Sequence, residues 1–297
     1  EGLCPKSHSS LRSSASLPYL HAFDYLSPED LACPPWADAP TRQRCEALLD
    51  WAAPTLFRHL TVSSLLQVLT LLLLEYRVVV ISRYVGVGAS IALGLSALLW
   101  PFRWQHLLLP VCPLQEAILD APVPFLCSLV LPRVATTLSS APTNMDRGRS
   151  KSWTSEEIVI CNAELGTVSV PTEVERWKPP AELLRQTPRL ASLRQRLVGC
   201  SKNVGSQVAA PEFPRERGRE HAAVEMCSAL RAGMQEIAKK MLLVSRQVPG
   251  IIGTTVWRDD MEIQILEAQD LAEDFYQEFA NTECCLMFLE RALDSFD

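Results

Sequence analysis

Hydrophobic residues recur with a helical period in the first patterned part of the chain. From Thr41 onward, leucine and alanine return every three or four positions, which places them on one face of an α-helix. A second run of this kind follows Thr61 and Ser63, either of which is a competent N-cap. The pattern predicts two helices, of which the second ends near Glu75.

A different pattern follows these helices. Residues Arg77–Ser82 form a nearly continuous run of β-branched side chains without polar alternation. Such runs are typical of strands that are buried on both faces of a parallel sheet, so Val78–Ile81 are all expected to be out of solvent. A helix over about 89–100 and apolar strands over 107–111 and 125–131 are predicted next, with the helix crossing between strands.

The remaining pattern completes the predicted fold. Two short apolar runs, 157–162 and 166–170, flank a brief connection and predict a β-hairpin. The chain then returns to a helical period, most clearly across 220–246, and closes with helices near 265–280 and 282–295. The predicted fold class is α/β, with a small three-layer, mostly parallel sheet flanked by helices and followed by a helical C-terminal subdomain.

The chain divides into three predicted parts. Residues 1–40 are rich in serine, proline and alanine and lack periodicity, which indicates an extended connector. Residues 41–180 form the α/β lobe, in which 134–152 is expected to be an exposed loop. Residues 181–297 form the helical segment. Because the sequence begins with glutamate and not methionine, we expect it to be a piece of a longer protein.

Composition and charge restrict the possible partners. The chain has 28 Lys and Arg against 34 Asp and Glu, a net charge of −6, which argues against nucleic acid as the partner. Ten cysteines are scattered without CxxC or framework spacing, which favours reduced thiols and a cytoplasmic location. Neither cysteine nor histidine shows metal-ligand spacing, so we expect no metal and no cofactor. The most apolar stretch, Leu65–Ile81, is broken by Gln67, Glu75 and Arg77, so no transmembrane segment is expected.

Two motifs raise the question of chemistry in a pocket. The segment Gly86–Ser90 lacks the third glycine of a dinucleotide fingerprint and the Gly-Lys-Ser/Thr end of a P-loop, so it is interpreted as a plain turn between strand and helix. Ser96 has nucleophile-elbow spacing on one side only and falls inside a predicted helix. With His106 and Asp120 as partners, the residue order would also differ from that of the α/β-hydrolases. A small-molecule hydrolase is therefore the least favoured function, and no catalytic residue is assigned.

Four segments, taken in order, resemble the central region of the DENN domain. They are Leu73–Ser82, Leu98–His106, Leu109–Pro113 and Leu119–Leu126, which read LLEYRVVVIS, LLWPFRWQH, LPVCP and LDAPVPFL. The resemblance implies a module of three parts: an upstream longin-like lobe, which this chain is expected to lack, the central α/β lobe, and a trailing helical dDENN-like segment.

The resemblance also implies a function. DENN modules are guanine-nucleotide exchange factors for Rab-family GTPases in membrane trafficking, and they break no covalent bond. Recruitment to vesicle membranes would then occur through partners. Two alternatives stay open, a non-catalytic GTPase-binding scaffold and a GTPase-activating partner. The second needs an arginine that reaches the γ-phosphate, for which Arg83 and Arg103 are the candidates.

The partner-binding residues are expected at one edge of the sheet. Open α/β sheets present their binding crevice at the C-terminal ends of the strands, and aromatic and arginine side chains make the strongest interface anchors. The six candidates are Arg83, Tyr84, Trp104, Gln105, His106 and Asp120. For Trp104 and His106 the alternative is that they brace the fold.

Overall fold

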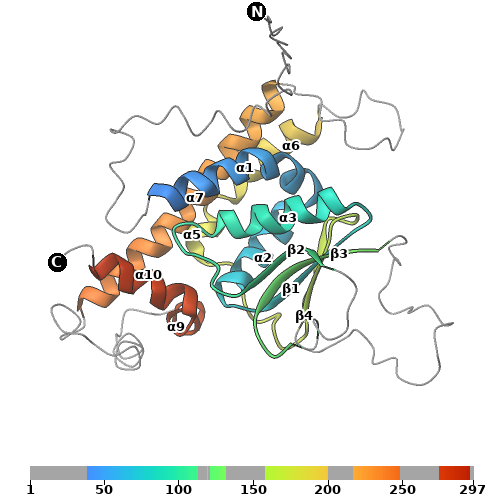
Figure 1. Ribbon diagram of the computed structural model, residues 1–297. Helices are drawn as coiled ribbons and strands as arrows, with labels where there is room; N and C mark the ends of the chain where they lie inside the picture. The colour runs from blue at the N-terminus through green and yellow to red at the C-terminus, as the bar shows by residue number, and fades with distance from the viewer. Residues whose placement is uncertain are drawn as a thin grey trace, which may run out of the picture. The chain divides into compact units, whose positions relative to one another are not determined.

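The computed structural model describes most of the patterned part of the chain (Figure 1). The described residues are 39–112, 119, 121–131, 158–199, 217–247 and 274–294. All of them belong to one compact unit within residues 34–297. The predicted loop at 134–152, the predicted connector up to residue 38 and the candidate Asp120 lie outside the described residues.

The strands and the helices α1 to α3 come first in the described chain. In order, the elements are α1 (Ala39–His59), α2 (Val62–Leu73), β1 (Arg77–Ser82), α3 (Val85–Leu98), β2 (Leu107–Cys112), β3 (Phe125–Val130), β4 (Ile158–Asn162) and β5 (Thr167–Ser169). The later elements are α5 (Ala181–Leu184), α6 (Thr187–Gly199), α7 (Arg217–Gln247), α9 (Asp274–Ala280) and α10 (Glu283–Asp294). Thr61 is the N-cap of α2, since its side chain accepts a hydrogen bond from the Ser64 amide at 3.1 Å.

The sheet has five strands in the order β2-β3-β1-β4-β5. The first four run parallel to one another, and β5 is antiparallel to β4. Strand β1 is central, and its residues Val78–Ile81 are each at most 3% exposed. The predicted burial of this strand on both faces is confirmed, as is the hairpin formed by β4 and β5.

Both faces of the sheet are covered. Val78 and Val80 point into the larger hydrophobic core, where they meet α2 and α3. Val79 and Ile81 belong to a second cluster on the other face, together with Cys127 of β3. The predicted α/β class, a mostly parallel sheet with flanking helices followed by C-terminal helices, is confirmed.

The C-terminal helices share the larger core with the α/β part. Side chains of α7, such as Met226 and Ile237, and of α10, such as Phe288, are buried in the same cluster as α1 to α3. Helix α6 is joined to α1 by a polar contact as well, because Arg194 Nε donates to the carbonyl oxygens of Phe57 at 3.2 Å and Leu60 at 2.8 Å. These carbonyls lie at the end of α1, where the helix supplies no partners of its own. None of the described helices is both long enough and apolar enough to cross a membrane.

One local prediction is wrong. The segment that begins at Gly86 was expected to be a turn, with the helix beginning near Ala89, but α3 already begins at Val85. Gly88 serves close packing instead: a Cβ at this position would lie 2.0 Å from Ser128 Oγ on β3. The glycine therefore allows the first turn of α3 to rest directly on the sheet.

Candidate functional site

The structure separates the predicted partner-binding residues into two groups. Arg83 and Tyr84 directly follow β1, at the C-terminal edge of the parallel strands. Trp104, Gln105 and His106 precede β2, which runs parallel to β1, so they lie at the opposite edge. The expectation that all of them lie at the C-terminal ends is therefore wrong for the second group. The reason is that α3 returns the chain to the N-terminal edge before β2 begins.

The C-terminal edge carries an exposed surface, which we call the exposed edge. It consists of Arg83, Tyr84 and Val85 after β1 and of Glu164 and Leu165 in the turn between β4 and β5. Tyr84, Val85 and Leu165 are 40%, 48% and 52% exposed. Because β1 and β4 are neighbours, the two segments end side by side and present aromatic, aliphatic and charged groups together.

Hydrogen bonds fix the backbone of the exposed edge. Glu164 Oε1 accepts from the Arg83 amide at 3.1 Å, and Glu164 Oε2 lies 4.0 Å from Arg83 Nε. Asn162 Oδ1 accepts from the amides of Glu164 and Leu165 at 3.0 and 3.1 Å. The Tyr84 amide donates to Ser82 Oγ at 3.1 Å. The backbone that carries these side chains is thus fixed by hydrogen bonds. The solvent-exposed ion pair between Arg83 and Glu164 itself adds little stability.

At the N-terminal edge, side chains meet in what we call the buried junction, formed by Glu75, Phe102, Trp104, His106 and Cys284. Glu75 Oε1 accepts from the Cys284 amide, at the start of α10, at 2.7 Å. Glu75 Oε2 lies 3.1 Å from His106 Nε2, although the two groups are not aligned as a hydrogen bond. The side chains of Glu75 and His106 are 13% and 21% exposed.

Aromatic packing completes the buried junction. Phe102 meets Phe279 of α9 and Phe288 of α10 edge to face, with ring centroids 5.0 Å apart in both pairs. Trp104 packs edge to face on His106 at 5.4 Å, and its Nε1 donates to the Leu107 carbonyl at 3.2 Å. These contacts favour the bracing role for Trp104 and His106. Gln105, between them, is exposed.

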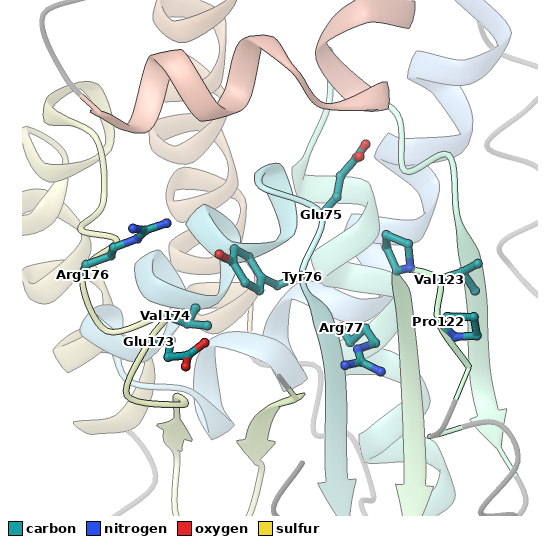
Figure 2. A pocket seen from close by; sticks show the side chains of 9 residues that line it. Glu75, Tyr76, Arg77, Pro122, Val123, Glu173, Val174 and Arg176 are labelled. Carbon is teal, nitrogen blue, oxygen red and sulfur yellow. The ribbon is translucent and has the colours of Figure 1, made fainter. Parts of the chain in front are cut away.

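A hollow of about 730 Å³ opens beside the buried junction (Figure 2). It is lined by Glu75, Tyr76, Arg77, Pro122, Val123, Pro124, Glu173, Val174 and Arg176. Figure 2 shows Tyr76 and Arg176 on one side of the hollow, Pro122 and Val123 on the other, and Arg77 between them. Among the described residues that line the hollow there are two carboxylates, Glu75 and Glu173, and no serine, cysteine, lysine or histidine.

Two partners fix the walls of this hollow. The Tyr76 hydroxyl accepts from Trp177 Nε1 at 2.8 Å, and the guanidinium of Arg176 lies over the Trp177 ring at 4.5 Å. On the other side, Arg77 Nη1 donates to the Ala121 carbonyl at 3.3 Å. Both Tyr76 and Arg77 are thereby held at the entrance of β1.

The residues considered for catalysis lie apart from these features. Ser96 is half-buried within α3, not at a turn from strand to helix. Of the two arginines considered for a γ-phosphate contact, Arg83 has a side chain that is 53% exposed. Arg103 is partly buried beside the start of α10, where its carbonyl accepts from Cys284 Sγ at 3.0 Å. Burial lowers the pKa of Arg103 from its ordinary value. Arg83 is therefore the more accessible of the two.

Comparison with known proteins agrees with the resemblance seen in the sequence. The family model described as "DENN (AEX-3) domain" matches residues 39–143. Human DENN domain-containing protein 2B is 38% identical over 76 residues, which cover 25% of this chain and 7% of that protein. Human DENN domain-containing protein 2A is 38% identical over 77 residues, covering 26% and 8%. Human DENN domain-containing protein 1B is 30% identical over 118 residues, covering 39% and 13%.

The matches are confined to one region of much longer relatives. They span at most 13% of the length of these three proteins. Within this chain, the family model covers α1 to β3, which includes the central strand, Arg83 and Tyr84, and the loop before β2. Residues 39–143 of the chain therefore match the DENN domain family.

Proposed function

We propose that the chain is a module of a guanine-nucleotide exchange factor for a Rab-family GTPase in membrane trafficking. The observation that carries this proposal is the DENN match over residues 39–143. The DENN family is known in general for its relation to Rab exchange. We further propose that residues 41–180 are the central lobe and that residues 181–297 supply the trailing helical segment.

The exposed edge is the surface on which we place the GTPase. It combines a tyrosine and an arginine, the residue types that most often anchor interfaces, with two exposed aliphatic side chains on a backbone fixed by hydrogen bonds. Gln105 is the accessible candidate at the other edge. Acceleration of nucleotide release by about 10⁴ requires binding the open GTPase some 5.5 kcal/mol better than the closed one. An interface of ~1,600 Å² can supply that difference.

A GTPase-activating partner is the second candidate function, and the exposure of Arg83 favours it over a pure scaffold. The two activities differ in their first product. An exchange factor speeds the release of GDP without hydrolysis, whereas an activating partner speeds the appearance of inorganic phosphate from bound GTP. A scaffold binds the GTPase and changes neither rate.

The test measures both products across a panel of Rab GTPases. Release of fluorescent GDP and formation of phosphate are followed with the 297-residue chain alone and with the chain fused behind the longin-like lobe of a DENN relative. We expect weak binding and slow exchange by the chain alone, and faster GDP release by the fusion on one or a few members. Absence of GDP release with every member, for the fusion as well, would contradict the proposal.

A further inference from the structure

Glu75 joins two parts of the fold that are far apart in sequence. One oxygen of its carboxylate holds the amide of Cys284, 209 residues away, at 2.7 Å, and the other faces His106 Nε2 at 3.1 Å. The first contact reaches the start of α10, and the second reaches the loop before β2. A single side chain thus contacts both sides of the buried junction.

The backbone of Glu75 indicates that its side chain is required. Its φ angle is +59°, a left-handed conformation in which glycine has no steric penalty and a long side chain does. The residue lies between the end of α2 and the start of β1, in a tight turn for which glycine would be the least strained choice. Residues held in such conformations against their preference are found preferentially where the side chain has a role.

The contacts around Glu75 all join the same two segments. Phe102 is held between Phe279 and Phe288, and Cys284 Sγ donates to the Arg103 carbonyl at 3.0 Å. The loop of residues 100–106 is therefore attached to α9 and α10 through three contacts, two made by Phe102 and one by Arg103, and the Glu75 carboxylate lies against both the loop and α10. Figure 2 shows the Glu75 side chain directed toward the C-terminal helix that crosses above the hollow.

We propose that Glu75 is a positioning residue that makes the loop of residues 100–106 and the helices α9 and α10 move as one unit. With the carboxylate in place, the orientation of His106 and Trp104 depends on the docking of α10, and the docking of α10 depends on the loop. If the proposed GTPase function holds, a partner that touches Gln105 would be sensed by the C-terminal helices through this link. The positioning role itself does not rest on that function.

Three substitutions at Glu75 distinguish the effects of side-chain length, charge and backbone strain. Glu75→Gln keeps the reach and an oxygen acceptor for the Cys284 amide. Glu75→Asp keeps the charge but is one methylene too short, and aspartate tolerates the left-handed conformation. Glu75→Gly removes the side chain and relieves the backbone. Amide hydrogen exchange of the 297-residue chain, without any GTPase, is followed in peptides covering 281–287 and 102–108.

The expected result is a joint response of both peptides. For Glu75→Asp and Glu75→Gly we expect exchange in 281–287 and in 102–108 to rise together by about tenfold or more, the effect of losing a hydrogen bond to a charged group. Glu75→Gln should stay within about threefold of the unmodified chain. Exchange across β1 and the middle of α7 should not change, and Glu173→Ala, on the wall of the same hollow, serves as the control.

Three outcomes would overturn the proposal. One is unchanged exchange in 281–287 for both Glu75→Asp and Glu75→Gly, and a second is a rise in one peptide without the other. The third is a rise for Glu75→Gln equal to that for Glu75→Gly. If Glu75→Gly unfolds throughout, Glu75→Asp alone decides between these results. Since no GTPase is present, failure here leaves the exchange proposal intact, and failure of the exchange assay leaves this one intact.

Discussion

The two edges of the same parallel sheet differ in how their side chains are used. At the C-terminal edge, Tyr84, Val85 and Leu165 project into solvent from a backbone fixed by hydrogen bonds. At the N-terminal edge, Glu75 instead lies beside His106 and accepts a hydrogen bond from the start of α10. Both edges belong to the same strands. The difference in side-chain exposure therefore comes from the loops and helices attached at each edge.

This contrast separates recognition from mechanical support. Anchoring residues must be exposed before a partner binds, and the exposed edge offers Arg83 and Tyr84, which belong to the residue types that most often anchor interfaces. Buried residues that contact one another contribute to the stability of the fold and to the orientation of its elements. Substitutions at the two edges should therefore act on different observables, binding at one and stability at the other.

The largest effect is expected in the strand that carries both edges. Val79 is 3% exposed and packs against the second hydrophobic cluster. Val79→Asp places an unpaired charge there, at a cost of several kcal/mol against a total stability of about 5 to 15 kcal/mol. We expect the protein not to fold, with loss of the cooperative thermal transition in circular dichroism. A folded Val79→Asp variant would show that water reaches this face of the sheet.

The packing of α3 on the sheet gives the next effect. Gly88→Ala would bring a methyl group to 2.0 Å from Ser128 Oγ, and such overpacking costs about 1 to 3 kcal/mol. Gly86 is the control, because nothing lies within 4 Å of its added Cβ, and alanine there should be neutral or stabilising by up to about 1 kcal/mol. Urea denaturation measures both. Adding Ser128→Ala should recover part of the Gly88→Ala loss, and a lack of recovery would place the clash elsewhere.

The exposed edge should affect binding alone. We expect the Arg83→Ala and Tyr84→Ala double variant to slow nucleotide release by about tenfold in a protein that is active on its GTPase, which corresponds to about 1.4 kcal/mol of interface energy. The melting temperature should not shift, because both residues are exposed. Glu173→Ala, at the other edge, is the matched control. Equal exchange rates for the double variant and the unmodified protein would remove this surface from the proposed interface.

The smallest effect tests a single hydrogen bond at the N-terminal edge. Tyr76→Phe removes the hydroxyl that accepts from Trp177 Nε1 at 2.8 Å and leaves the donor of a buried indole without this partner. We expect a loss of about 1 kcal/mol in the free energy of unfolding, with no change in nucleotide exchange. A change in exchange without a change in stability would reverse the roles assigned to the two edges.

The sequence predicted the elements whose pattern is local. The continuous β-branched run identified β1 as the buried central strand, and the period of apolar residues located α2 and α7. The start of α3 was missed because glycine is read as a turn signal, whereas Gly88 is needed for a close approach to Ser128, 40 positions further along the chain. A contact of that kind has no local signature.

The site was predictable only in part for the same reason. Residues after a strand could be assigned to one edge, as Arg83 and Tyr84 were. Trp104 and His106 were misplaced because they were treated as following strands, although the chain had already crossed back over α3. Glu164 was missed: it meets Arg83 across 81 residues, and a lone glutamate in a turn gives no signal. Glu75 was placed at the end of the second predicted helix, but its contacts with His106 and Cys284 depend on tertiary packing.

The burial of the cysteines has a consequence for thiol chemistry. Burial raises the pKa of the Cys127, Cys161 and Cys227 thiols to about 12 and raises that of Cys284 as well, with the nearby Glu75 charge adding to the effect there. Since the thiolate is the reactive form, alkylating reagents at neutral pH should reach these sulfurs only when the surrounding structure opens. The order in which they become alkylated would record which part of the fold opens first, with Cys284 reporting the C-terminal helices and Cys161 the sheet.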